Sequence, residues 1–449
     1  LYALLYDKTF QDSPKLERRG DKIPGSANLF NFQKLVSTQK QHAVYSGSET
    51  EIKKLVDFII NYGVSIGASD IHFERDRKEV KLRYRIDGIC QEPEMPWLKE
   101  NLKNKPEAVI SRIKVMSNLD ISEKRMPQDG VFRASYKEGN QVFDLDFRVA
   151  TCPAIVGENI TIRILDSRKA GLGLESLNHS PYVLDRLKKL FKSSAGMILV
   201  SGPTGSGKSS TLYAALQYIN QPGIKIITAE DPIEYSFPGI MQTQINTKIE
   251  LTFARLLRSF LRLDPDVILV GEIRDTETAG IGFDAAQTGH LLLSTIHTND
   301  SVSAVTRLLD LGIDHNQIAS SLLGVLSQRL VRRNCPKCSR PFTVPKEEWR
   351  FFFKKYPDHI QFYKGIGCTS CDFTGFSGRT LISELFELNR NISLAISSKT
   401  GETELRSLCA KEGLKTMVDD GLSKTNQISL SELIRVVPLE MTKEFKNRE

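Results

Sequence analysis

The chain of 449 residues lacks several features that would assign it to other classes of protein. It has no apolar run of about 18 residues, which excludes a membrane-spanning helix, and no segment with the pattern of a signal peptide. It has no low-complexity stretch and no internal repeat, which excludes fibrous and solenoid architectures. Its net charge of +7 is mild for this length and does not by itself indicate a nucleic-acid partner.

Cysteine is also scarce, because the chain has only 7 and their spacing does not form a disulfide framework. Four of them lie in two C-x-x-C pairs, whereas Cys90, Cys152 and Cys409 stand apart. This usage suits a reducing cytosol, with one metal site and three ordinary thiols. The composition, 40% hydrophobic and 26% charged, is that of a soluble globular protein. A chain of this length can form roughly two to four domains.

A phosphate-binding loop is the most informative segment of the chain. It follows an apolar run at 197–201, which predicts a buried strand, and it precedes a predicted helix. Glycines let the backbone turn tightly, so that its N–H groups and the helix N-terminus cradle phosphate. Lys208 would contact the β- and γ-phosphates, and the Ser209 hydroxyl would ligate Mg²⁺. The predicted nucleotide-binding residues are Gly202, Pro203, Thr204, Gly205, Ser206, Gly207, Lys208, Ser209 and Ser210.

Acidic residues after two further apolar runs predict the rest of a nucleotide site. Glu272 directly follows a predicted strand at 266–271. The glutamate side chain is long enough to reach the attacking water and polarise it. Glu230 and Glu234 follow a predicted strand at 224–229, at the edge where open α/β sheets bind ligands. With Asp231 they make three carboxylates that could hold Mg²⁺ through water, although an exposed acidic turn explains the motif equally well.

Histidines and arginines supply further candidates. His290 and His297 bracket an apolar run and could sense the γ-phosphate by hydrogen bonding, although a structural role is more frequent for histidine. Arg258 lies with two other arginines, Arg255 and Arg262, on the polar side of a predicted helix at 252–263. That side is either a solvated basic face or a set of phosphate ligands.

Arg148 and Arg163 lie in two runs of alternating polarity, 143–149 and 159–165. Both occupy polar positions in the alternating pattern, so each would project from one face of a sheet. This is a suitable place for an arginine finger if the domain packs against the edge of a nucleotide.

The two C-x-x-C pairs predict a metal site. Cys335 and Cys338 form one pair, Cys368 and Cys371 form the other, and 29 residues separate them. Two such knuckles can supply four thiolates to one tetrahedral Zn²⁺, which leaves no open position and therefore indicates a structural site. Iron–sulfur or redox chemistry is the less favoured alternative.

The pattern of elements changes along the chain. Residues 50–168 contain short alternating runs and turn signals, typical of an α+β domain with an antiparallel sheet. From about residue 181 onward, continuous apolar runs alternate with helical segments. That pattern is typical of an α/β fold whose parallel sheet is covered on both faces.

These motifs, in this order, resemble the type II/type IV secretion ATPases, the hexameric motors of type II secretion and type IV pilus assembly. The resemblance covers about residues 50–449. Besides the segments named above, it rests on Ala68-Ser-Asp-Ile-His72, Pro127-Gln-Asp-Gly130, Gly271-Glu-Ile-Arg-Asp275 and His297-Thr-Asn-Asp300.

The resemblance implies ATP and ADP as ligands, Mg²⁺ as cofactor, a homo-hexamer, and peripheral association with an inner-membrane platform protein at the cytoplasmic face. By matching positions, Glu272 resembles the catalytic glutamate, and Arg148 and Arg163 resemble the phosphate-neutralising arginines of the sheet domain. Arg258, Arg262 and Arg274 resemble those of the ATPase domain. The tetracysteine segment is typical of the assembly and secretion branch and disfavours a pilus-retraction ATPase.

A RecA-like nucleic-acid translocase is the rival from another class, but the chain lacks the aromatic–basic pattern of a single-strand channel. We therefore expect no nucleic-acid partner. Because the first residue is Leu rather than Met, we also expect that an N-terminal region is missing.

The predicted fold is an α/β RecA-like P-loop ATPase domain preceded by a smaller α+β antiparallel-sheet (PAS-like) domain. The predicted segments are a linker or remnant of a lost domain at 1–48, the α+β domain at 49–168, a linker at 169–180, the ATPase core at 181–334, the zinc subdomain at 335–371, and a C-terminal strand and helices at 372–449.

Overall fold

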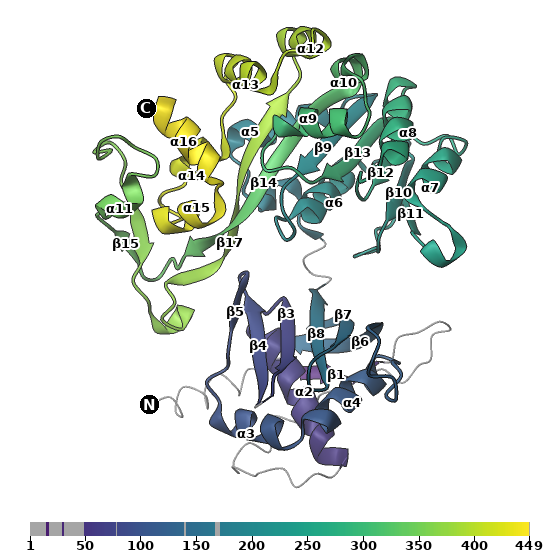
Figure 1. Cartoon of the computed structure of the whole chain (residues 1–449), viewed down its shortest axis with the longest axis vertical. Helices are drawn as coiled ribbons and strands as arrows, with labels where there is room; N and C mark the ends of the chain where they lie inside the picture. The colour runs from purple at the N-terminus through teal and green to yellow at the C-terminus, as the bar shows by residue number, and fades with distance from the viewer. Residues whose placement is uncertain are drawn as a thin grey trace. The chain divides into compact units, whose positions relative to one another are not determined.

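The structure is a computed structural model that describes residues 15–17, 29–30, 49–77, 79–138, 141–166 and 171–448 (Figure 1). Apart from two short strands, the predicted N-terminal linker at 1–48 lies outside these residues. The chain divides into two compact units, Leu1–Ala170 and Gly171–Glu449, and this division falls within the segment predicted as an interdomain linker. Every helix in the described part of the chain is too short or too polar to cross a membrane.

The first unit is an α+β domain built on one sheet in the order β1-β6-β7-β8-β3-β4-β5, with β2 paired to β6. Its long neighbours pair antiparallel, as the alternating sequence predicts. The strands are β1 (Lys15–Glu17), β2 (Leu29–Phe30), β3 (Asp70–Arg75), β4 (Val80–Ile86), β5 (Ile89–Gln91), β6 (Gln128–Glu138), β7 (Gln141–Pro153) and β8 (Glu158–Asp166).

One face of this sheet forms the core of the first unit. Helix α2 (Glu49–Ser65) buries an apolar stripe that includes Leu55 and Ile59, and it also contacts α4 (Pro106–Met116). Helix α3 (Pro96–Asn104) packs near β4. On the sheet side, Phe132 and Phe147 stack with their ring centroids 4.6 Å apart. Because side chains alternate along a strand, the other face is left to polar residues.

The second unit contains the predicted α/β fold, with a sheet in the order β11-β10-β12-β13-β9-β14-β17. All its neighbouring strands pair in parallel except β14 and β17, which pair antiparallel at one edge. The strands are β9 (Gly196–Ser201), β10 (Ile226–Glu230), β11 (Ile240–Gln244), β12 (Val267–Val270), β13 (Leu291–Ile296), β14 (Leu322–Asn334) and β17 (Phe376–Glu387).

Every residue of the central strands β9, β10, β12 and β13 is buried, because helices cover both faces of the sheet. These helices are α5 (Pro181–Leu190), α6 (Lys208–Ile219), α7 (Phe253–Phe260), α8 (Thr276–Gln287), α9 (Ser303–Asp310) and α10 (His315–Ser321). The predicted linker also contributes to this unit, since the 3₁₀ helix Leu174–Leu177 buries both of its leucines.

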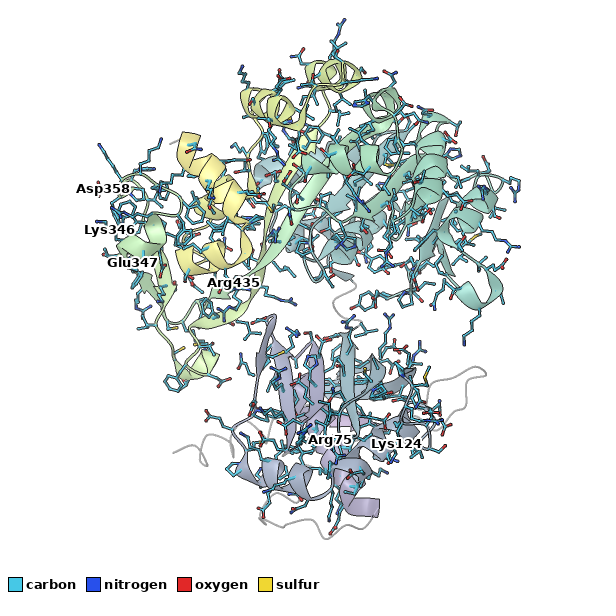
Figure 2. The ribbon with its side chains drawn as sticks, viewed as in Figure 1. Arg75, Lys124, Lys346, Glu347, Asp358 and Arg435 are labelled. Atoms are coloured by element: carbon cyan, nitrogen blue, oxygen red, sulfur yellow. The ribbon has the colours of Figure 1, made fainter. Side chains whose placement is uncertain are left out.

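Strands β14 and β17 extend beyond the sheet and flank the cysteine module, which contains β15 (Ser339–Pro341), α11 (Lys346–Trp349) and β16 (Tyr363–Gly365). Figure 2 shows Lys346, Glu347 and Asp358 on the outside of this module. The chain ends in the helices α12 (Arg390–Ser397), α13 (Glu402–Lys411), α14 (Met417–Ser423), α15 (Leu430–Val436) and α16 (Leu439–Arg448). Of these, α14 packs on β17, α15 packs on β14, and α12 contacts α10.

Candidate active site and metal centre

The phosphate-binding loop connects β9 to the N-terminus of α6, as predicted. Its glycines Gly202, Gly205 and Gly207 have φ angles of 138°, 76° and 88°, a backbone region that favours glycine. A Cβ atom at Gly202 would lie 2.5 Å from the carbonyl oxygen of Gln328, so no larger residue fits there. The exposed hydroxyl groups of Ser209 and Ser210 lie in the first turn of α6, beside the unpaired N–H groups of the helix end.

Lys208 curls back over this loop. Its ammonium group donates hydrogen bonds to the carbonyl oxygens of Gly202 and Pro203 at 2.9 and 3.1 Å. Burial lowers the pKa of Lys208, and the negative charge of Glu272 acts in the opposite direction. Lys208 and Glu272 are therefore close enough to interact, as expected of two parts of one site.

Glu272 lies two residues beyond the end of β12, and its side chain is only 13% exposed. One of its oxygens, Oε2, lies 2.6 Å from Arg274 Nε and 3.7 Å from His297 Nε2. His297 follows the end of β13, the strand between β12 and β9, so parallel strand ends bring these groups together. Burial and the charge of Lys208 lower the pKa of His297, so the imidazole is neutral at pH 7.

The structure does not bring His290 to this edge of the sheet. His290 precedes β13 and His297 follows it, so the full length of a six-residue strand separates them. Its backbone carbonyl accepts a hydrogen bond from Gly196, at the start of β9, and its ring lies 3.0 Å from the carbonyl oxygen of Ala285. The prediction that His290 senses the γ-phosphate is therefore not supported by its position.

Glu230 and Glu234 occupy different surroundings. Glu230 ends β10 and is buried, and its carboxylate accepts hydrogen bonds from Tyr213, from Thr228 at 2.5 Å and from Gln242 at 3.0 Å. The Tyr213 hydroxyl also accepts a hydrogen bond from the backbone N–H of Glu234 at 3.2 Å. Because Tyr213 lies on α6, this cluster ties the acidic segment to the helix that begins in the phosphate-binding loop.

The arginines of the second unit follow the predicted amphipathic pattern. Arg255, Arg258 and Arg262 are exposed, whereas Leu257 and Phe260 are buried. Arg258 pairs with Glu277 at 2.7 Å, and Arg262 donates to the Arg258 carbonyl oxygen at 2.9 Å. These contacts hold both side chains on the outer surface of this unit.

In the first unit, four charged residues line up across the polar face of the sheet. Arg148 on β7 lies directly opposite Arg163 on β8. Arg163 in turn lies opposite Asp70 on β3, and Asp70 lies opposite Arg85 on β4. We call Arg148, Arg163, Asp70 and Arg85 the arginine row. The two predicted arginines therefore share one face and one line of the sheet.

A residue that the sequence did not indicate, Gln328, supports the phosphate-binding loop. The buried Gln328 amide on β14 donates to the Ser206 carbonyl oxygen at 2.9 Å and accepts from the Thr211 hydroxyl at 2.8 Å. One side chain therefore holds both the loop and the first turns of α6. Only the pairing of β14 with β9 brings Gln328 there, so no local signal in the sequence predicts it.

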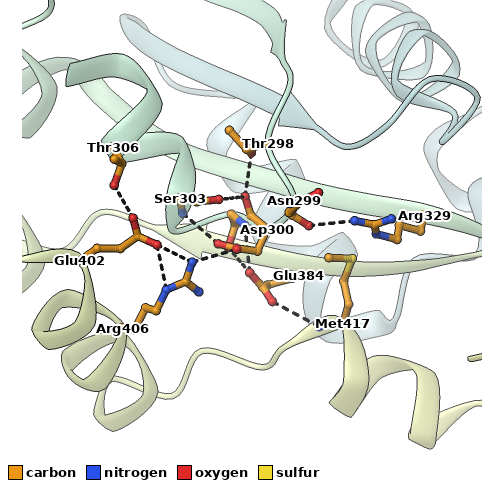
Figure 3. A network of polar contacts seen from close by, with 11 residues as sticks. Thr298, Asn299, Asp300, Ser303, Thr306, Arg329, Glu384, Glu402, Arg406 and Met417 are labelled. Carbon is orange, nitrogen blue, oxygen red and sulfur yellow. Dashed lines mark hydrogen bonds and ion pairs between the residues drawn. The ribbon is translucent and has the colours of Figure 1, made fainter. Parts of the chain in front are cut away.

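A network of polar contacts that the sequence did not predict anchors the loop that follows His297 (Figure 3). Asp300 accepts from the backbone N–H of Ser303 at 2.8 Å and from Arg406 at 2.8 Å. The buried Glu384 accepts from the backbone N–H groups of Ser301 at 3.0 Å and Met417 at 3.3 Å. The loop is thereby fixed to β17 and to the C-terminal helices.

The four predicted zinc ligands converge within the cysteine module. The Sγ atoms of Cys335, Cys338, Cys368 and Cys371 all lie within 4.8 Å of one another, and three pairs are 3.7–3.9 Å apart. Four thiolates on one Zn²⁺ would be about 3.8 Å apart, given Zn–S bonds of about 2.3 Å and tetrahedral angles. Backbone N–H groups of Cys368 and Gly375 also donate to Cys371 Sγ at 3.3 Å, which suits a thiolate.

A comparison with known families assigns the chain. The model of the family described as "Type II/IV secretion system protein" matches residues 46–436. The chain belongs to this family. The membership confirms the resemblance found in the sequence and the class of secretion and pilus-assembly ATPases, and ATP and ADP fit as the nucleotides.

Individual members of the secretion family match at high identity. The type II secretion system ATPase E of Vibrio cholerae is 44% identical over 400 residues, which cover 89% of this chain and 78% of that protein. The type IV pilus assembly ATPase PilB of Thermus thermophilus is 42% identical over 414 residues, which cover 92% of this chain and 46% of that protein. Secretion and pilus-assembly relatives therefore match almost equally well.

Two solved structures share the fold. The pilus retraction motor PilT with bound ADP is 27% identical, with a TM-score of 0.57 and coverage of 85% of this chain and 96% of that one. The ATPase DotB of Yersinia pseudotuberculosis has a TM-score of 0.64 at 21% identity, covering 90% of this chain and 97% of that one, and this match shows the fold alone.

Proposed function

We propose that the chain is a motor ATPase that powers assembly of a type IV pilus or a type II secretion pseudopilus. The observation that carries the proposal is the cluster of Lys208, Glu272 and His297 at one sheet edge, in a chain of the secretion family. Relatives named for secretion and pilus assembly match at 44% and 42% identity, whereas the retraction motor matches at 27%. The tetracysteine cluster also favours the assembly and secretion branch.

The chemistry follows from the positions of the side chains. The phosphate-binding loop and Lys208 would bind the β- and γ-phosphates of ATP. Glu272 would orient and polarise the attacking water, because Arg274 and His297 hold its carboxylate in place. A neutral His297 can hydrogen-bond to phosphate or water without adding charge.

Magnesium fits the same site. The Ser209 hydroxyl is exposed in the first turn of α6, where it would supply one of the oxygen ligands that a hard cation prefers. When bound, Mg²⁺ would neutralise the charge that develops on the phosphates. The buried Glu230 already accepts three hydrogen bonds, so Glu234 is the better placed of the two for contact through water.

The wider assembly is part of the same proposal. Family resemblance supports a homo-hexamer at the cytoplasmic face of the inner membrane, where a platform protein would receive the motion. By the same resemblance, Arg148 and Arg163 of the first unit would neutralise phosphate charge. In the second unit, Arg274 would contribute positive charge beside Glu272. Family resemblance implies the same role for Arg258 and Arg262, which lie on the outer surface of this unit.

The replacement Glu272→Gln tests the proposed chemistry. The amide keeps the size of the side chain but cannot polarise water, so phosphate release should fall at least about 100-fold while ATP binding persists. The measurements are steady-state phosphate release and binding of a fluorescent ATP analogue. Glu404→Gln, an exposed position on α13, is the matched control and should retain normal turnover. Normal hydrolysis by Glu272→Gln would refute the assignment.

We also propose that the cysteine module holds a structural Zn²⁺. Elemental analysis of the purified chain should find about one zinc per chain, and Cys335→Ser with Cys368→Ser should remove it. Cys152→Ser is the control, because Cys152 is exposed and lies outside the cluster. Undamaged protein that contains no metal, or a double variant that retains zinc, would contradict the proposal.

A further inference from the structure

The segment Ala68–His72 resembles the family, but no function has been attached to it above. Its Asp70 is the single acidic member of the arginine row, between Arg163 on one side and Arg85 on the other. Like charges placed directly opposite each other on neighbouring strands are destabilising. Arg148 and Arg163 are such a pair, so an acidic neighbour in the same row has a clear physical use.

Asp70 is held rigidly in this row. Its side chain is only 10% exposed, and the Ser69 hydroxyl donates to its Oδ2 atom at 2.8 Å. The same Oδ2 lies 3.7 Å from Arg85 Nε, while Oδ1 accepts a hydrogen bond from Arg163 Nε at 3.0 Å. The backbone N–H of Ile164 also donates to the Ser69 carbonyl oxygen at 2.9 Å, which fixes the two strands to each other at this point.

The contact with Arg163 uses one particular donor. A guanidinium carries five N–H groups, and its terminal fork is the part that matches two oxygens of a phosphate. Asp70 bonds to Nε, at the base of the group, so this bond does not occupy the terminal fork. The Arg163 side chain is 57% exposed, which means that an anion can reach it.

We propose that Asp70 is a positioning residue for ATP hydrolysis: it holds Arg163 at Nε and thereby presents the terminal fork to phosphate. The proposal rests on the proposed role of Arg163 as a phosphate ligand. Arg85 belongs to the same arrangement, because its charge attracts the shared carboxylate from the other side of the row. Orientation of a binding group before the reaction raises kcat more than it lowers KM.

The test is a double-mutant cycle in the full chain, with kcat and KM for ATP measured for Asp70→Asn, Arg163→Ala and the combination. We expect Asp70→Asn to lower kcat about tenfold with little change in KM, since a loose guanidinium is misplaced only at the reacting centre. Because Asp70 acts through Arg163, the combined variant should equal Arg163→Ala alone.

Glu74→Gln is the matched control for lost charge. Glu74 lies on the same strand and the same face as Asp70, and it also pairs with an arginine, although Arg83 reaches it diagonally and through a terminal nitrogen rather than through Nε. It is outside the arginine row, so its kcat should stay within about twofold of the parent value. Equal losses of kcat in Glu74→Gln and Asp70→Asn would overturn the proposal, because they would indicate a general effect on the sheet.

A second variant guards against misfolding of Asp70→Asn. Arg163→Lys keeps a positive charge but has neither the Nε donor nor the fork, so it should lose kcat to a similar extent and be insensitive to Asp70→Asn. The outcomes also separate the two proposals. Unchanged kcat in Arg163→Ala would refute the phosphate role of Arg163. A loss in Arg163→Ala with additive effects in the cycle, or a higher kcat in Asp70→Asn, would refute only the role of Asp70.

Discussion

The two sheets place their functional side chains in opposite ways. In the second unit the central strands are parallel and buried on both faces, and the candidate catalytic groups Glu272 and His297 lie just beyond strand ends. In the first unit the sheet is antiparallel with one polar face, and Arg148, Arg163 and Asp70 lie within the strands. A parallel sheet therefore gathers chemistry at one edge, whereas an open antiparallel face can display a line of charges.

Two buried carboxylates, one from each unit, also differ in how their charge is satisfied. In the first unit, the fully buried Lys114 and Glu158 form an ion pair at 2.7 Å, and Lys114 also donates to the Glu123 carbonyl oxygen at 2.6 Å. In the second unit, the buried Glu384 accepts hydrogen bonds from Ser301 and Met417 instead of bonding to a cation. One carboxylate is neutralised by a partner charge, and the other is solvated by polar donors.

The largest effect is expected from breaking the buried pair. Lys114→Met leaves Glu158 as a buried charge without its partner, which should lower the free energy of unfolding by about 3–5 kcal/mol. Lys99→Met is the matched control, because it removes an exposed pair with Glu92 and should cost about 0–1 kcal/mol.

The two tryptophans allow each unit to be followed separately, since Trp97 lies in the first and Trp349 in the second. In a Trp349→Phe background, Trp97 is the remaining tryptophan, so its fluorescence during denaturant unfolding of Lys114→Met reports only the first unit. Similar losses in Lys114→Met and Lys99→Met would show that burial does not distinguish these two pairs.

A smaller, pH-dependent effect is expected at Glu384. Burial raises its pKa to about 6 from an ordinary value of 4.5, against the opposing effect of the Ser301 hydroxyl; the charge of Asp300 raises it further. The folded state therefore binds this proton more tightly, and the free energy of unfolding falls by about 2 kcal/mol as the pH rises through this range. Glu384→Gln removes this titration.

The measurement is the difference in unfolding free energy between Glu384→Gln and the parent, followed by Trp349 fluorescence in a Trp97→Phe background. Between pH 4.5 and 7, that difference should shift in favour of the variant by about 2 kcal/mol. A constant difference across this range would show that hydrogen-bond donors alone keep Glu384 ionised at its ordinary pKa.

Local motifs predicted the parts of the site that are contiguous in sequence. The phosphate-binding loop is defined by glycines within one turn, and Glu272 is defined by the strand that immediately precedes it. The two C-x-x-C pairs also predicted a metal site from sequence, because four cysteines at this spacing are typical of metal ligands. The alternation of polar and apolar residues along each strand predicts that Arg148 and Arg163 lie on the polar face. Only the pairing of β7 with β8 shows that they lie directly opposite each other.

Features that depend on distant pairing were not predictable. Gln328 reaches the phosphate-binding loop across 122 residues, and Arg406 reaches Asp300 across 106. The error at His290 has a different cause. A strand rises about 3.3 Å per residue, so two histidines that flank six residues cannot meet at one edge, and this argument was available from the sequence.

Strand β14 joins two sites that carry different chemistry. Gln328 holds the phosphate-binding loop from this strand, and Cys335, the first metal ligand, follows its last residue, Asn334. Because side chains alternate along a strand, inserting or deleting one residue between them would turn one of the two groups to the wrong side. The number of residues between Gln328 and Cys335 is thus constrained by both sites.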